Sequence, residues 1–126
     1  MSNSNHWLRY TSLLFAIATH LARWDKVYHT ACLALTCSTL VRHWCAYAHR
    51  GIVLTDRLVA HLCFLLCAHT HMVEEPNAAG MVCVALVLGL WVLEHRIDDW
   101  ARAHACLHAV GFVGITLAVY SRRAIV

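Results

Sequence analysis

Charged residues and helix-breaking residues are both scarce in this sequence. Only 13% of its 126 residues are charged, against roughly 25% in a soluble domain, and it has one proline and five glycines. So little proline and glycine excludes disordered or low-complexity segments. The 60% of residues that are hydrophobic exceed what the core of so short a chain can bury. The composition therefore predicts a protein surrounded by lipid.

The chain also lacks a basic cluster, a CxxC pair and a presequence. Lysine and arginine are spread over the loops and the net charge is only +3, which excludes nucleic-acid binding. Cysteine occurs an odd number of times, mostly within apolar blocks, and we interpret these residues as small packing side chains. Residues 1–6 predict no secretory signal or transit peptide. A mitochondrial inner membrane stays open, because some imported proteins carry internal signals.

Five apolar blocks joined by short polar connections fill the chain. A span needs about 20 residues to cross a bilayer, and short connections make neighbouring helices antiparallel. We expect an all-α fold: a polytopic transmembrane helical bundle that forms one domain over residues 1–126. Its five spans are predicted at about 8–22, 27–47, 58–73, 78–93 and 103–120.

Aromatic and small residues support this arrangement. Every tryptophan and tyrosine lies near a block end, where rings with a polar tip meet the membrane interface. Pro76 is expected to stop a helix. Lysine and arginine divide six to four between the two sides, which favours a cytoplasmic N-terminus. Small residues four apart let helices approach closely, and three such pairs occur: Ala34 and Ser38, Ala85 and Gly89, Gly114 and Ala118.

Histidine is unusually abundant, with eleven residues. An ionisable side chain in a span is costly, so it usually faces a bundle interior, a cavity or a cofactor. His104 and His108 share one helix face and could present two imidazoles to one metal ion. The alternative is interfacial histidines with satisfied hydrogen bonds, beside a solvated loop of acids and arginines over 94–102.

A second group of histidines is predicted on the opposite side of the membrane. Two histidines from different helices could ligate haem b. His29 with His69 or His71 is the pair that this alternative offers.

The segment 38–43 (STLVRH), followed by Asp56 and by His104-x-x-x-His108, resembles the signature of the CREST superfamily. That superfamily includes alkaline ceramidases, hemolysin III and progestin-receptor-like proteins, and myomaker relatives. Its members have a Ser four residues before a His, then an Asp that begins the third span, then an HxxxH in the last span. Here Thr39 stands at the hydroxyl position. The family has seven spans, whereas this chain has room for five, and Arg42 adjoins the histidine of the motif.

The CREST resemblance implies zinc-dependent hydrolysis of a lipid amide or ester within the membrane. His43, His104 and His108 would hold the zinc and leave a position open for water, whose pKa the metal lowers. Asp56 would act as the base or orient that water, and Thr39 would position the oxyanion.

A second resemblance rests on His43-Trp44 and on the run 53–56 (VLTD). These are similar to the small haem- and quinone-binding membrane anchor subunit of succinate dehydrogenase, which has a Thr-Asp-Tyr turn before its third span. Arg57 stands here in place of the tyrosine that would contact quinone.

Nearly all of the chain is predicted span, with no loop long enough for a lid. The sequence therefore favours an accessory subunit of a larger membrane complex, such as a respiratory assembly, with lipids and other transmembrane subunits as partners. A CREST-like zinc hydrolase is the first alternative, and a haem or quinone anchor is the second. The enzyme requires the three histidines and Asp56 to converge on one pocket. The subunit requires an apolar, small-residue surface for a foreign helix.

Overall fold

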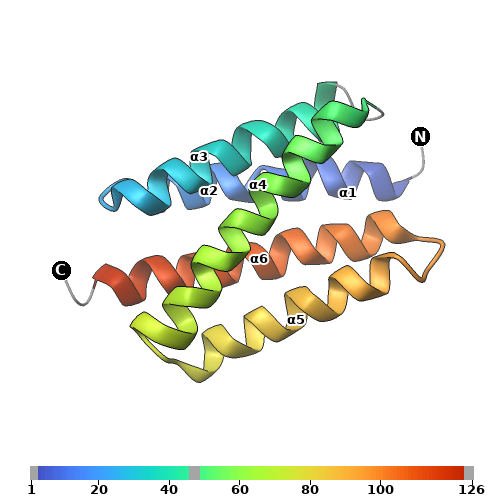
Figure 1. Cartoon of the computed structure of the whole chain (residues 1–126). Helices are drawn as coiled ribbons and strands as arrows, with labels where there is room; N and C mark the ends of the chain where they lie inside the picture. Colours follow the sequence, from blue (N-terminus) through green and yellow to red (C-terminus); the bar gives the residue numbers. More distant parts are fainter. Residues whose placement is uncertain (1–2, 46–48, 124–126) are drawn as a thin grey trace.

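A computed structural model describes residues 3–45 and 49–123, and all regular structure in them is helical. The helices form five consecutive rods that run alternately in opposite directions, with α4 crossing the others obliquely (Figure 1). The rods are α1 (Asn3–Ser12) with α2 (Leu14–Leu21), α3 (Lys26–Leu40) with the π-helix η1 (Val41–Cys45), α4 (Arg50–His69) with the π-helix η2 (Thr70–Glu74), α5 (Ala78–Glu94), and α6 (Trp100–Arg123). The predicted all-α fold is confirmed.

The helix boundaries follow from side-chain caps. Asp25 and Asn77 accept hydrogen bonds from backbone N–H groups at the starts of α3 and α5, and Pro76 lies in the break before α5, as predicted. His49 caps α4 through the N–H of Ile52 at 3.4 Å, so α4 begins at Arg50 rather than near residue 58. Asp56 therefore lies in the second turn of α4. The predicted end of the second span at Tyr47 falls outside the described residues.

The second and third rods both end in a π-helical turn. A π-helical turn closes its hydrogen bonds over five residues instead of four, which changes the direction of the side chains that it carries. The wider turns of η1 and η2 bury two neighbours each: Arg42 with His43, and Thr70 with His71. These turns therefore direct adjacent polar residues inward, and such turns are frequent at functional sites.

The helix α6 lies at the centre of the bundle and packs against α1, α2, α4 and α5. Gly114 permits a close approach of α5 and α6, because a Cβ there would stand only 3.4 Å from the Cβ of Cys83 on α5. All seven cysteines are free thiols, and four of them are buried (Cys32, Cys63, Cys67 and Cys83). The packing role predicted for cysteine is confirmed for these four.

Hydrophobic side chains also cover the outside of the rods. The rods 50–74 and 100–123 are long and apolar enough to cross a membrane, by length and composition; the rod 78–94 is apolar but shorter. Only 17% of the most apolar stretch of 50–74 is buried, and Leu58, Leu62 and Leu65 are 58–61% exposed. That membrane crossing extends to all five rods stays a prediction.

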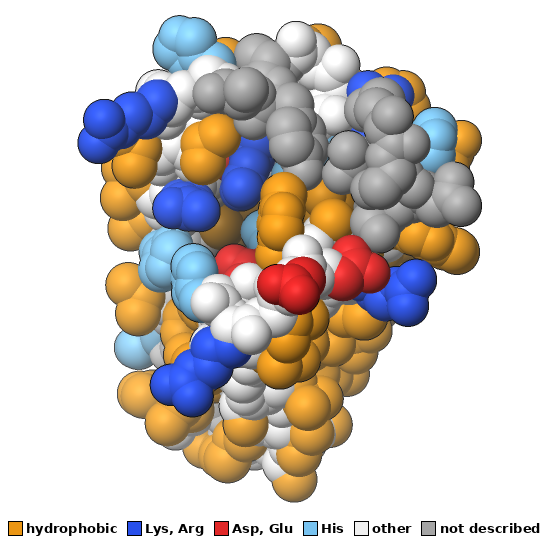
Figure 2. All heavy atoms as spheres, turned by 90° about the vertical axis from the view of Figure 1, so that its right-hand side faces the viewer, with side chains coloured by type: hydrophobic (Ala, Val, Ile, Leu, Met, Phe, Trp, Pro, Cys, Tyr) orange, Lys and Arg blue, Asp and Glu red, His pale blue; other side chains and the backbone are white. Residues whose placement is uncertain are grey.

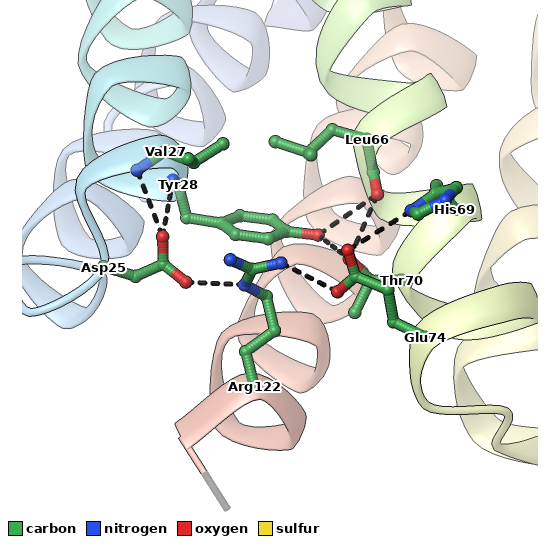
Figure 3. A network of polar contacts seen from close by, with 8 residues as sticks. All are labelled: Asp25, Val27, Tyr28, Leu66, His69, Thr70, Glu74 and Arg122. Carbon is green, nitrogen blue, oxygen red and sulfur yellow. Dashed lines mark hydrogen bonds and ion pairs between the residues drawn. The ribbon is translucent and has the colours of Figure 1, made fainter. Parts of the chain in front are cut away.

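Polar side chains concentrate at the two ends of the rods. Figure 2 looks onto one end, where charged and histidine side chains gather above flanks that are largely hydrophobic. This end carries η1, the start of α4 and the connection from α5 to α6, and we call it the histidine end. At the opposite end, Arg122 bridges Asp25 and Glu74 (Figure 3), and we call this the ion-pair end.

Candidate metal centre

Three buried histidines meet at the histidine end. His43 comes from η1, and His104 and His108 come from successive turns of α6. Their ring centroids lie 4.7–5.6 Å apart, and one ligand atom from each lies within 4.8 Å of the others. In residues 3–45 and 49–123, no other group of three or more His, Cys, Asp or Glu side chains comes together in this way. The structure thus brings together the three histidines that the sequence suggested as ligands.

Glu94, the last residue of α5, fixes the orientation of His104. Its Oε2 lies 2.7 Å from His104 Nδ1, and both side chains are about one-tenth exposed. A carboxylate only accepts, so Nδ1 carries the proton and Nε2 keeps a lone pair. Metal-binding histidines usually have such a carboxylate partner. The expectation that the acids of 94–102 form a solvated loop is wrong for Glu94, because the turn after α5 brings it against α6.

Thr11 of α1 orients His108 in the same way. Its hydroxyl lies 2.7 Å from the carbonyl oxygen of Trp7, to which it donates, and 3.0 Å from His108 Nδ1. When the hydroxyl donates to Trp7, Thr11 Oγ1 accepts from Nδ1–H of His108. In that arrangement the lone pair of His108 is on Nε2, the nitrogen available to a metal.

The donor set fits a zinc ion. Three neutral imidazoles with one open position form a common catalytic zinc site, with Zn–N distances of about 2.0–2.1 Å. Tetrahedral ligation at that length places the nitrogens about 3.4 Å apart, so small side-chain movements bring these three into range. Imidazole ligands also suit copper, iron and nickel, but three nitrogens with a water position are typical of hydrolytic zinc.

Asp56 of α4 is the centre of a second buried cluster beside the histidines. Ser38 and Thr39 donate to its Oδ1 at 3.0 and 2.9 Å, and Arg42 donates to its Oδ2 at 2.9 Å. The Arg42–Asp56 ion pair is almost fully buried, with side chains 7% and 4% exposed. A carboxylate has about four acceptor positions, so one remains open here. Arg42 thus neutralises Asp56 rather than repelling a metal ion on its own.

A single cavity connects these groups. Thr39, Arg42 and Asp56 line it together with His104 and His108. From this polar end the cavity continues between α4, α5 and α6 along mainly apolar side chains as far as Gly114, Ile115 and His71. The arrangement places a possible base, a hydroxyl and two metal-ligand candidates on one apolar channel.

The histidines proposed for haem are not brought together as a cluster. His29 hydrogen-bonds through Nδ1 to the carbonyl of Thr19 at 3.1 Å, and exposed His69 pairs with Glu74 at 3.3 Å. Buried His71 uses both ring nitrogens, Nε2 on the carbonyl of Gly114 at 2.8 Å and Nδ1 on the amide of Asn77 at 2.9 Å. These contacts engage at least one ring nitrogen of each of the three histidines, whereas the three imidazoles of the histidine end face one another.

The chain matches no protein-family model, no curated protein and no solved structure.

Proposed function

We propose that this chain is an integral membrane hydrolase that holds zinc on His43, His104 and His108 and cleaves a lipid amide or ester. The observation that carries the proposal is the convergence of the three buried imidazoles, within 4.8 Å, from segments 61 or more residues apart in the sequence. Glu94 and Thr11, which fix two of the tautomers for metal binding, support it. Both contacts engage Nδ1, so they leave the Nε2 atoms of His104 and His108 to the cluster.

The reaction is the addition of water across an acyl–nitrogen or acyl–oxygen bond. When bound, zinc supplies Lewis acidity: it lowers the pKa of water and polarises the substrate carbonyl. The water oxygen bonds to the acyl carbon and the bond to the leaving nitrogen or oxygen breaks. One water proton moves to the leaving group, and the products are a fatty acid and an amine or alcohol.

Asp56 is the residue we assign to that proton transfer. It lines the cavity and has one acceptor position left after bonding to Ser38, Thr39 and Arg42. The three donors hold the carboxylate in one orientation, which general base catalysis requires. Thr39 positions Asp56 by donating its proton there, so its hydroxyl cannot at the same time donate to an oxyanion. This differs from the role that the CREST resemblance implies for Thr39.

We further propose that all five rods cross the membrane, with the histidine end at one headgroup boundary. Exposed hydrophobic side chains on each rod support this placement, because soluble monomers rarely expose so large a continuous apolar surface. The predicted spans 58–73, 78–93 and 103–120 fall within the rods, whereas the predicted first span ends one residue beyond Leu21 and the predicted end of the second lies outside the described residues.

Zinc content of the full chain, purified in mild detergent, tests the proposal first. We expect about one zinc per chain, lost in His104→Ala and His108→Ala. His95→Ala is the matched control: His95 is exposed, lies beside Glu94 and is not a member of the three-histidine group. Fatty-acid release from amide and ester lipids should stop with a chelator and return with zinc. Zinc content that is absent, or unchanged in both ligand variants, would refute the metal site.

An accessory subunit is the second candidate, favoured by one outward-facing packing surface. Ala85 and Gly89 of α5 are exposed, and a Cβ at Gly89 would meet nothing within 4 Å. The pair Gly114 and Ala118, in contrast, is buried inside the bundle. Extraction from the native membrane in mild detergent separates the candidates: migration with an assembly of hundreds of kilodaltons supports the subunit, whereas a monomer or dimer opposes it.

A further inference from the structure

The cavity carries more positive than negative charge where it meets the surface. Among its charged lining residues are two arginines, Arg42 and Arg57, and one carboxylate, Asp56. Arg42 is bound to Asp56, which leaves Arg57 as the uncompensated charge. Arg57 is exposed, and it has no ion-pair partner among residues 3–45 and 49–123. The entrance therefore favours an anion.

Beyond Arg57, the cavity becomes a narrow apolar channel. Trp91 and Phe64, which both line the cavity, contact each other edge-on at 5.1 Å, and the other face of this pair is extended by His61, which stacks on Trp91 at 4.6 Å. Along α6 the lining runs from His104 to Ile115, a rise of about 16 Å at 1.5 Å per residue. The free volume is only about 80 Å³, which excludes two chains or a ring system, and one unbranched chain fills this length only as the apolar lining side chains move apart.

We propose that the cavity takes a single-chain lipid with an anionic head group, held by Arg57 at the entrance while the acyl chain enters the channel. The amide or ester next to the head group then lies between Arg57 and the apolar channel, where His104, His108 and Asp56 line the wall. N-acyl amino acids supply this chemistry with a carboxylate, and lysophospholipids supply it with a phosphate. Cleavage of this lipid rests on the proposed function, but its binding does not.

The test is direct binding to the full chain in nanodiscs of zwitterionic lipid, with and without chelator. The probes are an N-acylglycine, a lysophosphatidic acid and a neutral N-acylethanolamine, all with the same acyl chain. We expect Arg57→Gln to weaken binding of the preferred anionic probe about 10-fold or more, as expected for losing a charge-assisted hydrogen bond, and to leave the neutral probe unchanged. Arg96→Gln is the control, since Arg96 is exposed on the same end and does not line the cavity.

The outcomes distinguish the two proposals. Charge-selective, Arg57-dependent binding without zinc or hydrolysis would leave the lipid site standing and refute the hydrolase. Equal affinity for anionic and neutral probes, or an Arg57→Gln variant that binds like the wild type, would overturn the lipid site even if zinc is present. Stronger binding of the acylglycine than of the lysophosphatidic acid identifies carboxylate as the natural anion, and the reverse identifies phosphate.

Discussion

The two ends of this bundle use polar residues in opposite ways. At the ion-pair end, Arg122 donates to Asp25 at 2.6 Å and to Glu74 at 2.7 Å, and Tyr28 hydrogen-bonds to Thr70 at 2.6 Å (Figure 3). Nearly every donor there has an acceptor in the same chain. The cluster joins the start of α3 to the ends of η2 and α6.

At the histidine end, the hydrogen bonds orient the histidine rings and do not use all of their ring nitrogens. Glu94 and Thr11 each engage Nδ1 of a histidine and so leave Nε2 with a lone pair. Several acceptor nitrogens brought together in the interior have little use in packing, but they suit a cation. Comparison of the two ends therefore separates polar groups that hold the fold from polar groups arranged for chemistry.

The largest effect on stability is expected from the buried ion pair at the histidine end. Asp56→Asn would leave Arg42 buried without a counter-ion and should lower the free energy of unfolding by about 3–5 kcal/mol. Thermal unfolding in detergent measures this. The double variant Arg42→Gln with Asp56→Asn should recover part of the loss. A double variant less stable than Asp56→Asn alone would show that the pair is not coupled as described.

Close packing near the ion-pair end gives the next largest effect. A Cβ at Gly80 would overlap the ring of His71, so Gly80→Ala should cost about 1–3 kcal/mol of unfolding free energy. Gly89→Ala, in the same helix but with nothing within 4 Å, should be neutral or stabilising by up to about 1 kcal/mol. Equal melting temperatures for the two variants would contradict the packing of His71 on Gly80.

Glu94→Gln tests whether the histidine end is prepared for metal. The amide keeps the shape of the carboxylate but makes a weaker hydrogen bond to His104, so zinc affinity should fall about 10–100-fold. Competition with a zinc chelator measures this, with His95→Ala as the control. If zinc affinity is unchanged in Glu94→Gln, the His104–Glu94 contact serves the fold alone.

The smallest effect is expected at Asp25 as the pH falls. Burial raises the pKa of the Asp25 carboxyl, but hydrogen bonds from Arg122 and from the backbone N–H groups of Tyr28 and Val27 outweigh it, so the pKa lies below 3.8. A lowered folded-state pKa contributes stability that is present above pH 3.8 and lost as the pH falls through the folded value.

The wild type should therefore lose more melting temperature between pH 5 and pH 3 than Arg122→Gln does. That variant should itself cost about 1–2 kcal/mol at neutral pH, because it removes charge-assisted hydrogen bonds. Parallel pH profiles for the two proteins would contradict this account of Asp25.

Apolar blocks and the short polar connections between them predicted the number and order of the rods, because both are visible in the sequence without knowledge of how the helices pack. The sequence predicted that His104 and His108 lie on one helix face, because they are four residues apart in a helix. The prediction that His43 joins them came only from the resemblance to the CREST superfamily.

Other features had no local signal. Thr11 lies 97 residues from His108 in the sequence, so nothing in either segment indicates the contact. Glu94 stands in a run of acids and arginines that looks solvated, and only the turn between α5 and α6 places it against His104. The partnership of Arg42 with Asp56 depends on η1, a local distortion that helical periodicity does not predict.

The turn η1 makes the spacing of this chain as important as its residue types. Deleting Val41 would shorten the spacing between Thr39 and His43 by one residue, and His43 would rotate by about 100° relative to Thr39. Arg42 and His43 would then face directions other than those that bring them to Asp56 and to the two histidines of α6, although every side chain of the centre would still be present. Homologous chains should therefore tolerate insertions and deletions in the 95–99 connection far more readily than in this one helical turn.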